Sequence, residues 1–143
     1  MEEKKKIYFC GSIRGGTQDR ELYFRMISRM KEEYRVLTEH IGSPELFNLE
    51  ADQTDEDIFS QDMNWLRESD FVVAECSTPS LGVGYEVAMA QVLGKKTYVL
   101  FRSRDRFHGL SAMISGDPYY EKLPYTTEEE LFEILSRIMQ ENH

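Results

Sequence analysis

Residues 71–93 read FVVAECSTPSLGVGYEVAMAQVL, and this stretch predicts the fold of the whole chain. Its first four residues are an apolar run that predicts a buried strand, and its last seven predict a helix. The turn between them contains a hydroxyl group at Ser80 and two glycines, Gly82 and Gly84. A strand, a glycine-containing turn and a helix together favour an anion site, because the free N–H groups and the positive end of the helix dipole attract phosphate.

Glu86 is the one residue of this stretch that does not fit a simple phosphate site. Its carboxylate comes two residues after Gly84 and would repel the anion that the turn attracts. A carboxylate in this place is useful only if it takes part in a reaction. We therefore treat Glu86 as a candidate catalytic residue.

A second strand, turn and helix of the same kind begin the chain. Residues 6–10 are rich in strand-forming side chains, and residues 18–34 repeat apolar side chains at helical spacing. The turn between them supplies candidates for binding an anionic ligand: Gly11, Ser12, Ile13, Arg14, Gly15 and Gly16. Its glycines match neither the dinucleotide-binding pattern nor the P-loop pattern. A plain tight turn is the alternative, although such a turn has no need of Arg14.

The remaining strands and helices alternate along the chain. Short strands are expected at residues 35–38, 96–101 and 123–125, and a helix follows two possible capping boxes near the end. This alternation predicts a single α/β domain over residues 1–143, a flavodoxin- or Rossmann-like doubly wound sheet of about five parallel strands with helices on both faces. Ligands of such sheets bind at the carboxyl ends of the strands, next to the point where the strand order reverses. The two turns described above flank that point.

Composition disfavours two classes of partner. The 143 residues carry a formal net charge of −9, which argues against a nucleic-acid backbone or an anionic membrane surface. A small anion stays compatible with that charge, because local N–H groups outweigh charges that are screened over about 10 Å. No apolar run is long enough to span a membrane and no signal peptide is visible, so we expect a cytoplasmic protein.

The two cysteines, Cys10 and Cys76, each stand at the end of a predicted strand. Buried free thiols in a reducing compartment are the expected state. Neither cysteine has partners at the spacing of metal ligands, so we expect no metal and no cofactor.

Two further titratable residues belong near the predicted ligand site. Asp62 lies on the apolar face of a helix predicted over residues 55–69. An acid among apolar neighbours is either functional or structurally satisfied. His40, after the strand predicted at 35–38, is more typical of a structural or rim position.

Two long connections show no clear pattern. Residues 41–57 are polar and acidic, and form either a lid over the ligand site or a variable surface loop. Residues 102–120 contain an apolar island, LSAMI at 110–114. This island either folds into the core of its own chain or contacts a neighbouring subunit.

Four motifs occur in one order along the chain: YFCGSIRGG at residues 8–16, QD-x-x-WL at 61–66, PSLGVGYE at 79–86 and LSAMI at 110–114. Together they resemble the 2′-deoxynucleoside 5′-phosphate N-hydrolases, the Rcl-type enzymes of the nucleoside 2-deoxyribosyltransferase superfamily. The resemblance runs from about residue 6 to residue 114.

This resemblance implies hydrolysis of the N-glycosidic bond of 2′-deoxynucleoside 5′-monophosphates, which yields a free base and 2-deoxyribose 5-phosphate. It implies that Glu86 is a nucleophile that forms a covalent glycosyl-enzyme intermediate, with Asp62 and Tyr8 as the other catalytic residues. It also implies a homodimer. The residues it assigns to substrate binding are Arg14, Ser80 and Gly82 on the phosphate, Ser111 on the phosphate in the partner subunit's site, and Met113 of the apolar island that the dimer explains.

General chemistry supports these roles. Departure of the base leaves an oxocarbenium-like sugar, which a carboxylate facing the anomeric carbon stabilises and then bonds to. The base leaves more readily when protonated, and Asp62 either supplies that proton or orients Glu86 or the sugar. Tyr8 is expected to hydrogen-bond Glu86 and to pack where a 2′-hydroxyl group would lie, which favours deoxy substrates.

Two other functions stay open. A nucleoside 2-deoxyribosyltransferase would use Glu86 in the same way, but it has no use for a phosphate clamp. A non-catalytic nucleotide-binding sensor would gain nothing from a carboxylate that faces the sugar. The sequence does not indicate which base is released.

Overall fold

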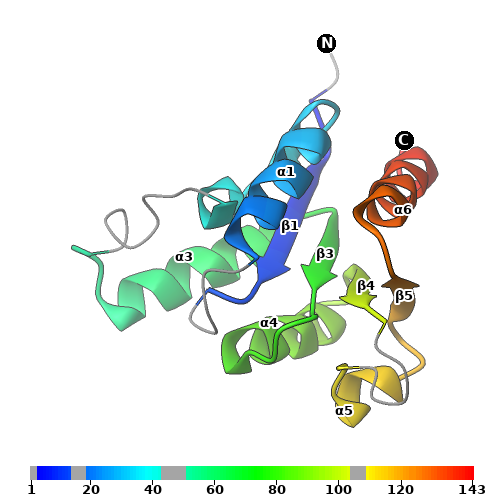
Figure 1. Cartoon of the computed structure of the whole chain (residues 1–143). Helices are drawn as coiled ribbons and strands as arrows, with labels where there is room; N and C mark the ends of the chain where they lie inside the picture. The colour runs from blue at the N-terminus through cyan, green and yellow to red at the C-terminus, as the bar shows by residue number, and fades with distance from the viewer. Residues whose placement is uncertain (1–2, 14–18, 43–50, 104–108) are drawn as a thin grey trace.

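The computed structural model of the chain describes residues 3–13, 19–42, 51–103 and 109–143. Its elements, in chain order, are β1 (Lys6–Gly11), α1 (Arg20–Lys31), β2 (Arg35–Val36), the 3₁₀ helix η1 (Glu39–Gly42), α3 (Asp55–Glu68), β3 (Phe71–Glu75), α4 (Leu81–Val92), β4 (Lys96–Arg102), α5 (Ala112–Ser115), β5 (Glu121–Tyr125) and α6 (Glu128–Glu141). Strands and helices alternate along the chain, as the sequence predicts (Figure 1).

The five strands form one parallel sheet in the order β2-β1-β3-β4-β5. β1 pairs with β3 from Ile7 opposite Phe71 to Gly11 opposite Glu75, so both strands end at the same edge of the sheet. The chain order reverses at this pair, because β2 lies on one side of β1 and β3 lies on the other. The switch point is therefore where the sequence predicts it.

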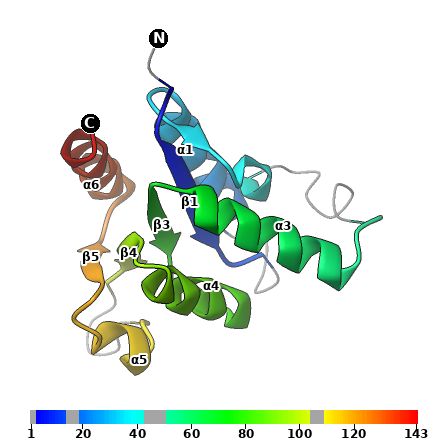
Figure 2. The same cartoon turned by 180° about the vertical axis from the view of Figure 1, so that it is seen from behind.

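Helices cover both faces of the sheet (Figures 1 and 2). Successive side chains of a strand point to opposite faces, and this alternation divides the core into two clusters. Phe9 and Leu100 belong to the cluster beneath α1 and α6. Cys10 and Val99, their neighbours along the strands, belong to the cluster beneath α3 and α4. The doubly wound α/β fold is confirmed.

Hydroxyl side chains fix where three of the helices begin. Thr54 starts α3 within a capping box, and Thr127 starts α6. At α4, the hydroxyl group of Ser80 accepts from the backbone N–H of Val83 at 3.2 Å. Each of these contacts satisfies an N–H group that has no partner inside the first turn. Ser80 and the start of α4 are thereby held together just beyond the end of β3.

The structure corrects the expected start of the helix after β3. The sequence predicts a turn that holds both glycines, whereas α4 begins at Leu81 and includes Gly82 and Gly84 in its first turns. Because glycine has a low helix propensity, the sequence pattern indicates a turn where the first turn of the helix lies. The cap at Ser80 is what begins the helix.

Other elements also differ in extent from the prediction, and the first helix is shorter than expected, since α1 ends at Lys31. β2 ends at Val36. Beyond it, the hydroxyl group of Thr38 accepts from the backbone N–H of Phe9 at 2.9 Å and donates to its carbonyl oxygen at 2.8 Å, in place of strand pairing. β5 begins at Glu121, two residues earlier than expected. The predicted loop over residues 102–120 contains the short helix α5, which is capped by Ser111.

Gly11 is required by the ring of Tyr23. A Cβ atom at position 11 would lie 2.8 Å from two carbon atoms of that ring. The ring has no room to move, since Tyr23 is 1% exposed and its hydroxyl oxygen accepts from the backbone N–H of Ser12 at 3.1 Å. The absence of a side chain at Gly11 therefore lets α1 close onto the end of β1.

The substitution Gly11→Ala should lower the free energy of unfolding by about 1–3 kcal/mol, because the added methyl group overpacks this contact. Urea unfolding followed by circular dichroism measures the change. Gly84→Ala is the matched control: its Cβ would meet no atom within 4 Å, and we expect stabilisation by about 0.5–1 kcal/mol from better helix propensity. Equal effects at the two sites would contradict the packing role of Gly11.

Candidate active site

The carboxylate of Glu86 and the phenol of Tyr8 meet beside the switch point. Tyr8 lies within β1 and is 1% exposed. Its hydroxyl group donates a hydrogen bond to Oε2 of Glu86. Glu86 itself lies on α4 and is only partly buried, so a ligand can reach it. The contact that the sequence predicts between these two side chains is present.

Burial raises the pKa of the Glu86 carboxyl group from its ordinary value of 4.5 to about 7. The hydrogen bond from Tyr8 lowers this pKa, and the nearby charge of Asp62 raises it. Burial also raises the pKa of the Tyr8 phenol far above its usual value, so the phenol keeps its proton and remains a donor. A carboxyl group with a pKa near neutrality, in reach of a ligand, is typical of catalytic sites.

Asp62 completes a group of three from three different elements. It lies on α3 and is partly buried. Its charge raises the pKa of both Tyr8 and Glu86, so α3 holds it within electrostatic reach of the pair. The structure thus brings together the three side chains that the sequence indicates as catalytic, although their roles stay predictions.

Aromatic rings border these acids. Phe59, one turn before Asp62 on α3, meets Tyr85 of α4 edge to face, with ring centroids 6.2 Å apart. The two residues are 47% and 57% exposed. One turn after Asp62, the ring centroid of Trp65 lies 5.5 Å from that of His40. Exposed ring faces of this kind suit a planar ligand.

The start of α4 offers donors for an anion. The helix begins directly after Ser80, and Gly82 in its first turn is exposed. The first N–H groups of a helix have no partner inside the helix, apart from those that a cap satisfies. Ser80 and Gly82 therefore stand where the sequence expects a phosphate to bind.

The other predicted anion-binding turn is described only in part. Gly11 and Ser12 are buried at the end of β1, beside the switch point. Ile13 is partly buried and packs against the cluster beneath α1 and α6, so its side chain also belongs to the core. Three predicted ligand-binding residues lie outside the described residues: Arg14, Gly15 and Gly16.

A groove of about 1010 Å³ runs between α4 and the segment around α5. Ser80, Ser111 and Met113 all line it, whereas the three predicted catalytic side chains do not. Its rim is apolar and open, since Leu81 is 97% and Met113 83% exposed. Within one chain, Ser111 and Met113 therefore share a groove with Ser80.

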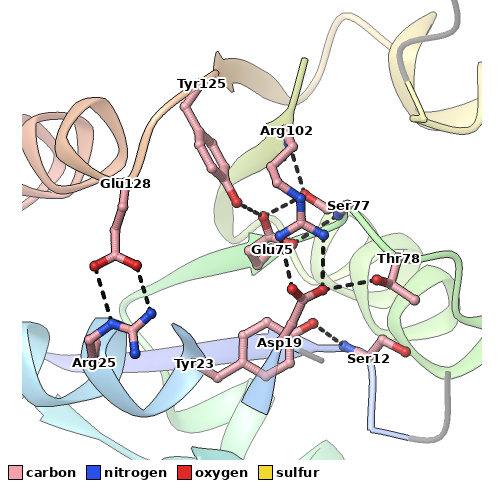
Figure 3. Close-up of polar contacts among 10 residues, drawn as sticks. All are labelled: Ser12, Asp19, Tyr23, Arg25, Glu75, Ser77, Thr78, Arg102, Tyr125 and Glu128. Carbon is pink, nitrogen blue, oxygen red and sulfur yellow. Dashed lines mark hydrogen bonds and ion pairs between the residues drawn. The ribbon is translucent and has the colours of Figure 1, made fainter. Parts of the chain in front are cut away.

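Sequence reasoning missed a polar cluster at the same edge of the sheet (Figure 3). Glu75, the last residue of β3, is fully buried and accepts hydrogen bonds from Ser77 and Tyr125. Next to it, Arg102 forms an ion pair with Asp19. The one signal in the sequence is Glu75 itself, an acid at the end of an otherwise apolar strand.

Within the ranges that the structure describes, no three side chains of His, Cys, Asp or Glu are grouped to hold a metal ion. None of the helices in those ranges is long and apolar enough to cross a membrane. Cys10 and Cys76 are both buried free thiols.

The fold and the site define a class of protein: a Rossmann-like α/β domain with a buried tyrosine and a carboxylate paired beside its switch point, next to the start of a helix. Comparison with known families narrows this class. The family model for nucleoside 2-deoxyribosyltransferase matches residues 7–134, and the chain belongs to this family.

Named relatives share much of the sequence. The chain is 52% identical over 112 residues to the 5-hydroxymethyl-dUMP N-hydrolase of Rattus norvegicus, a match that covers 77% of this chain and 68% of the rat protein. It is 41% identical over 143 residues to the protein of the same name from Danio rerio, covering 92% and 98% of the two chains. A solved structure of a Clostridium botulinum CMP N-glycosidase superposes with a TM-score of 0.63 at 16% identity, over 94% of this chain and 99% of that one, which supports the fold.

The pKa of Glu86 predicts how stability depends on pH. Because the folded pKa lies above the ordinary 4.5, the folded chain keeps a proton that the unfolded chain releases between pH 4.5 and about 7. The free energy of unfolding therefore falls as pH rises through this window. Glu86→Gln removes the titrating group. The difference in free energy of unfolding between this variant and wild type should therefore increase in favour of the variant by on the order of 3 kcal/mol from pH 4.5 to pH 8.

Urea unfolding at a series of pH values measures this difference. Tyr8→Phe is the complementary variant: it removes the hydrogen bond that lowers the pKa of Glu86, so the decline in stability should extend to higher pH than in wild type. Parallel curves for wild type and Glu86→Gln would show that the Glu86 carboxylate is not desolvated.

Proposed function

We propose that this chain hydrolyses the N-glycosidic bond of 2′-deoxynucleoside 5′-monophosphates and releases a free base and 2-deoxyribose 5-phosphate. The observation that carries the proposal is the hydrogen bond from Tyr8 to a carboxylate, Glu86, whose pKa is raised to about 7. The pair lies beside the switch point, where ligands of doubly wound sheets bind. The names of the rat and zebrafish relatives support the same bond and substrate class.

The substrate spans two regions of the site. Its 5′-phosphate binds at the start of α4, where Ser80 and the exposed backbone of Gly82 supply donors. The residues that follow β1 are proposed to contribute as well, with Arg14 as the cation. The base then lies toward the half-exposed rings of Phe59 and Tyr85. This orientation directs the anomeric carbon of the sugar toward Glu86.

Glu86 acts as the nucleophile in the first step. Its carboxylate oxygen forms a bond to the anomeric carbon as the bond from that carbon to the base nitrogen breaks, and the electron pair of that bond leaves with the base. Asp62 assists by delivering a proton to the base or by orienting the sugar. Because the pKa of Glu86 is about 7, the nucleophile is largely ionised just above neutral pH.

Water completes the reaction in the second step. It attacks the anomeric carbon, the ester bond to Glu86 breaks, and the carboxylate returns to its ionised form. The attacking water loses a proton at the same time. Asp62, whose charge acts on Glu86, accepts this proton. The sugar phosphate is then released.

Tyr8 contributes position and selectivity. Its phenol keeps its proton because burial raises its pKa, so it can only donate to Glu86. That bond fixes the carboxylate oxygen that is not used for attack. The buried ring also occupies space next to Glu86, and we propose that this space excludes a 2′-hydroxyl group.

The proposal includes a homodimer in the cytoplasm. The groove beside α4 has a rim of exposed apolar side chains, Leu81 and Met113, of the kind that marks association surfaces. Ser111 lines this groove and is exposed, so a partner subunit can reach it, and we propose that it contributes to the partner's site. The buried free thiols Cys10 and Cys76 suit a reducing compartment.

A panel of nucleotides tests the activity at pH 8, where Glu86 is ionised. We expect base release from deoxynucleoside monophosphates, at least about 100-fold slower release from the matching ribonucleotides, and loss of at least about 10³-fold in rate for Glu86→Gln. Chromatography of the released base measures all three. Wild-type rates in Glu86→Gln would rule out the proposed nucleophile.

The same assay separates the alternatives. A second free base, added as acceptor, would be converted into a new nucleoside or nucleotide by a deoxyribosyltransferase and left unchanged by a hydrolase. Tight binding of a monophosphate without any base release over hours would indicate a sensor instead of an enzyme.

Mixing two inactive variants tests whether Ser111 acts across the dimer. Glu86→Ala and Ser111→Ala remove groups from different subunits of one proposed site, so half of the sites in each mixed dimer regain both groups. At low substrate concentration, a refolded equimolar mixture should reach about a quarter of wild-type activity. If Ser111 serves its own chain, no mixed dimer contains an intact site, and the mixture should stay at the mean of the two parents.

A further inference from the structure

Asp19 does not do what an acid at the start of a helix ordinarily does. It occupies the N-cap position of α1, yet its side chain makes no capping hydrogen bond to the helix. An N-cap aspartate usually accepts from the backbone N–H groups of the first turn. A side chain that forgoes this role is evidence of a different one.

The carboxylate of Asp19 instead links two distant parts of the chain (Figure 3). Both of its oxygens accept from the guanidinium group of Arg102, at 2.9 and 3.1 Å. One of them also accepts from the hydroxyl group of Thr78 at 2.9 Å. A two-bond contact between arginine and a carboxylate fixes direction as well as distance.

These three residues belong to three neighbouring segments at one edge of the sheet. Asp19 is the residue from which α1 starts, and Arg102 is the last residue of β4. Thr78 lies between β3 and α4, two residues before Ser80. The contact therefore joins the exit of the glycine-rich turn after β1 to the segment that carries Ser80.

A buried layer beneath this contact holds Arg102 in place. The fully buried carboxylate of Glu75 accepts from the backbone N–H and hydroxyl group of Ser77, at 2.9 and 2.7 Å, and from the hydroxyl group of Tyr125 at 2.5 Å. The same Ser77 hydroxyl oxygen accepts from the backbone N–H of Arg102 at 2.8 Å. Unsatisfied, a buried carboxylate would destabilise the fold; here its hydrogen bonds make it a rigid anchor.

The start of the glycine-rich turn is held to the same frame. The backbone N–H of Ser12 donates to the hydroxyl oxygen of Tyr23, and the backbone N–H of Tyr23 donates to the carbonyl oxygen of Asp19 at 2.9 Å. Tyr23 thus connects the two described ends of this turn. The carboxylate of Asp19 binds Arg102 at the end of β4, and Tyr23 links Ser12 to Asp19, so both described ends of the turn are tied to β4.

We propose that Asp19, Arg102 and Thr78 are positioning residues that hold the segment carrying Ser80 at a fixed place beside the start of α1 and the end of β4, so that the start of α4 is set to bind the 5′-phosphate. This inference rests on the proposed function, because it assumes that the 5′-phosphate binds at the start of α4. None of the three residues needs to touch the substrate. This role explains why the Asp19 side chain does not cap α1, since a capping hydrogen bond would draw its carboxylate away from Thr78.

Binding of a nucleotide and of its nucleoside measures the positioning separately from stability. The probes are 5-hydroxymethyl-dUMP and 5-hydroxymethyl-2′-deoxyuridine, titrated by calorimetry into the Glu86→Gln protein, in which cleavage is blocked. Adding Thr78→Val or Asp19→Asn should weaken binding of the nucleotide about tenfold and change binding of the nucleoside less than about twofold. Thr78→Ser keeps the hydroxyl group and should restore nucleotide binding.

The chain offers a matched control for loss of an ion pair. Arg25 and Glu128 form a similar two-bond contact, at 3.2 and 2.7 Å, between α1 and α6 on the exposed surface (Figure 3). Glu128→Gln removes it without approaching the phosphate site, and should leave both affinities unchanged. The conservative Thr78→Val keeps the test decisive if Asp19→Asn fails to fold.

The outcomes distinguish a failure of the proposed phosphate site from a failure of the positioning role. If the Glu86→Gln protein binds the nucleotide no more tightly than the nucleoside, the phosphate clamp of the proposed function is wrong and the positioning role goes with it. If it prefers the nucleotide and the added variants keep that preference, only the positioning role is wrong. Tighter nucleotide binding in Asp19→Asn would show that this carboxylate acts on the phosphate by charge repulsion and not by position.

Discussion

The hydrogen bond from Tyr8 to Glu86 is the interaction on which the site depends. A carboxylate that leaves water becomes harder to ionise, and for Glu86 this effect raises the pKa to about 7. A fully desolvated acid would stay protonated at neutral pH and could not act as a nucleophile. The phenol opposes that shift, since it donates to the ionised form and is too deeply buried to lose its own proton. Tyr8 can do this only because β1 is covered on both faces.

The parallel pairing of β1 with β3 places the remaining groups around that bond. The two strands end together, so the turn after β1 and the segment before α4 emerge side by side. Hydrogen bonding at the sheet fixes the spacing of the strands, but not that of the segments beyond them. The contact of Asp19 with Arg102 and Thr78 extends the fixed geometry past the last strand residues. The segment that carries Ser80 is thereby tied to the start of α1 and the end of β4.

Much of this arrangement could be predicted from the sequence. Buried parallel strands are uninterrupted apolar runs, so residues 71–74 identified β3, and the alternation with helices identified the sheet and its switch point. The family resemblance brought Tyr8, Asp62 and Glu86 together as catalytic candidates. The cluster around Glu75 could not be found in this way, because its hydrogen bond to Tyr125 joins residues 50 positions apart and Asp19 lies 83 positions from Arg102. Periodicity reports which face is buried, and not which polar atoms meet. The four-residue helix α5 is likewise too short to show a period.

The two edges of the sheet have a consequence for how copies of this chain can associate. An open edge strand offers unpaired N–H and C=O groups, and two such edges can join into one continuous sheet. Here one edge is β2, which has only two residues, and the other is β5, which contains Pro124 and so lacks one donor. Both edges are poor templates for another strand. Aggregation by strand addition is thereby disfavoured, and association is left to helix surfaces such as the apolar rim beside α4.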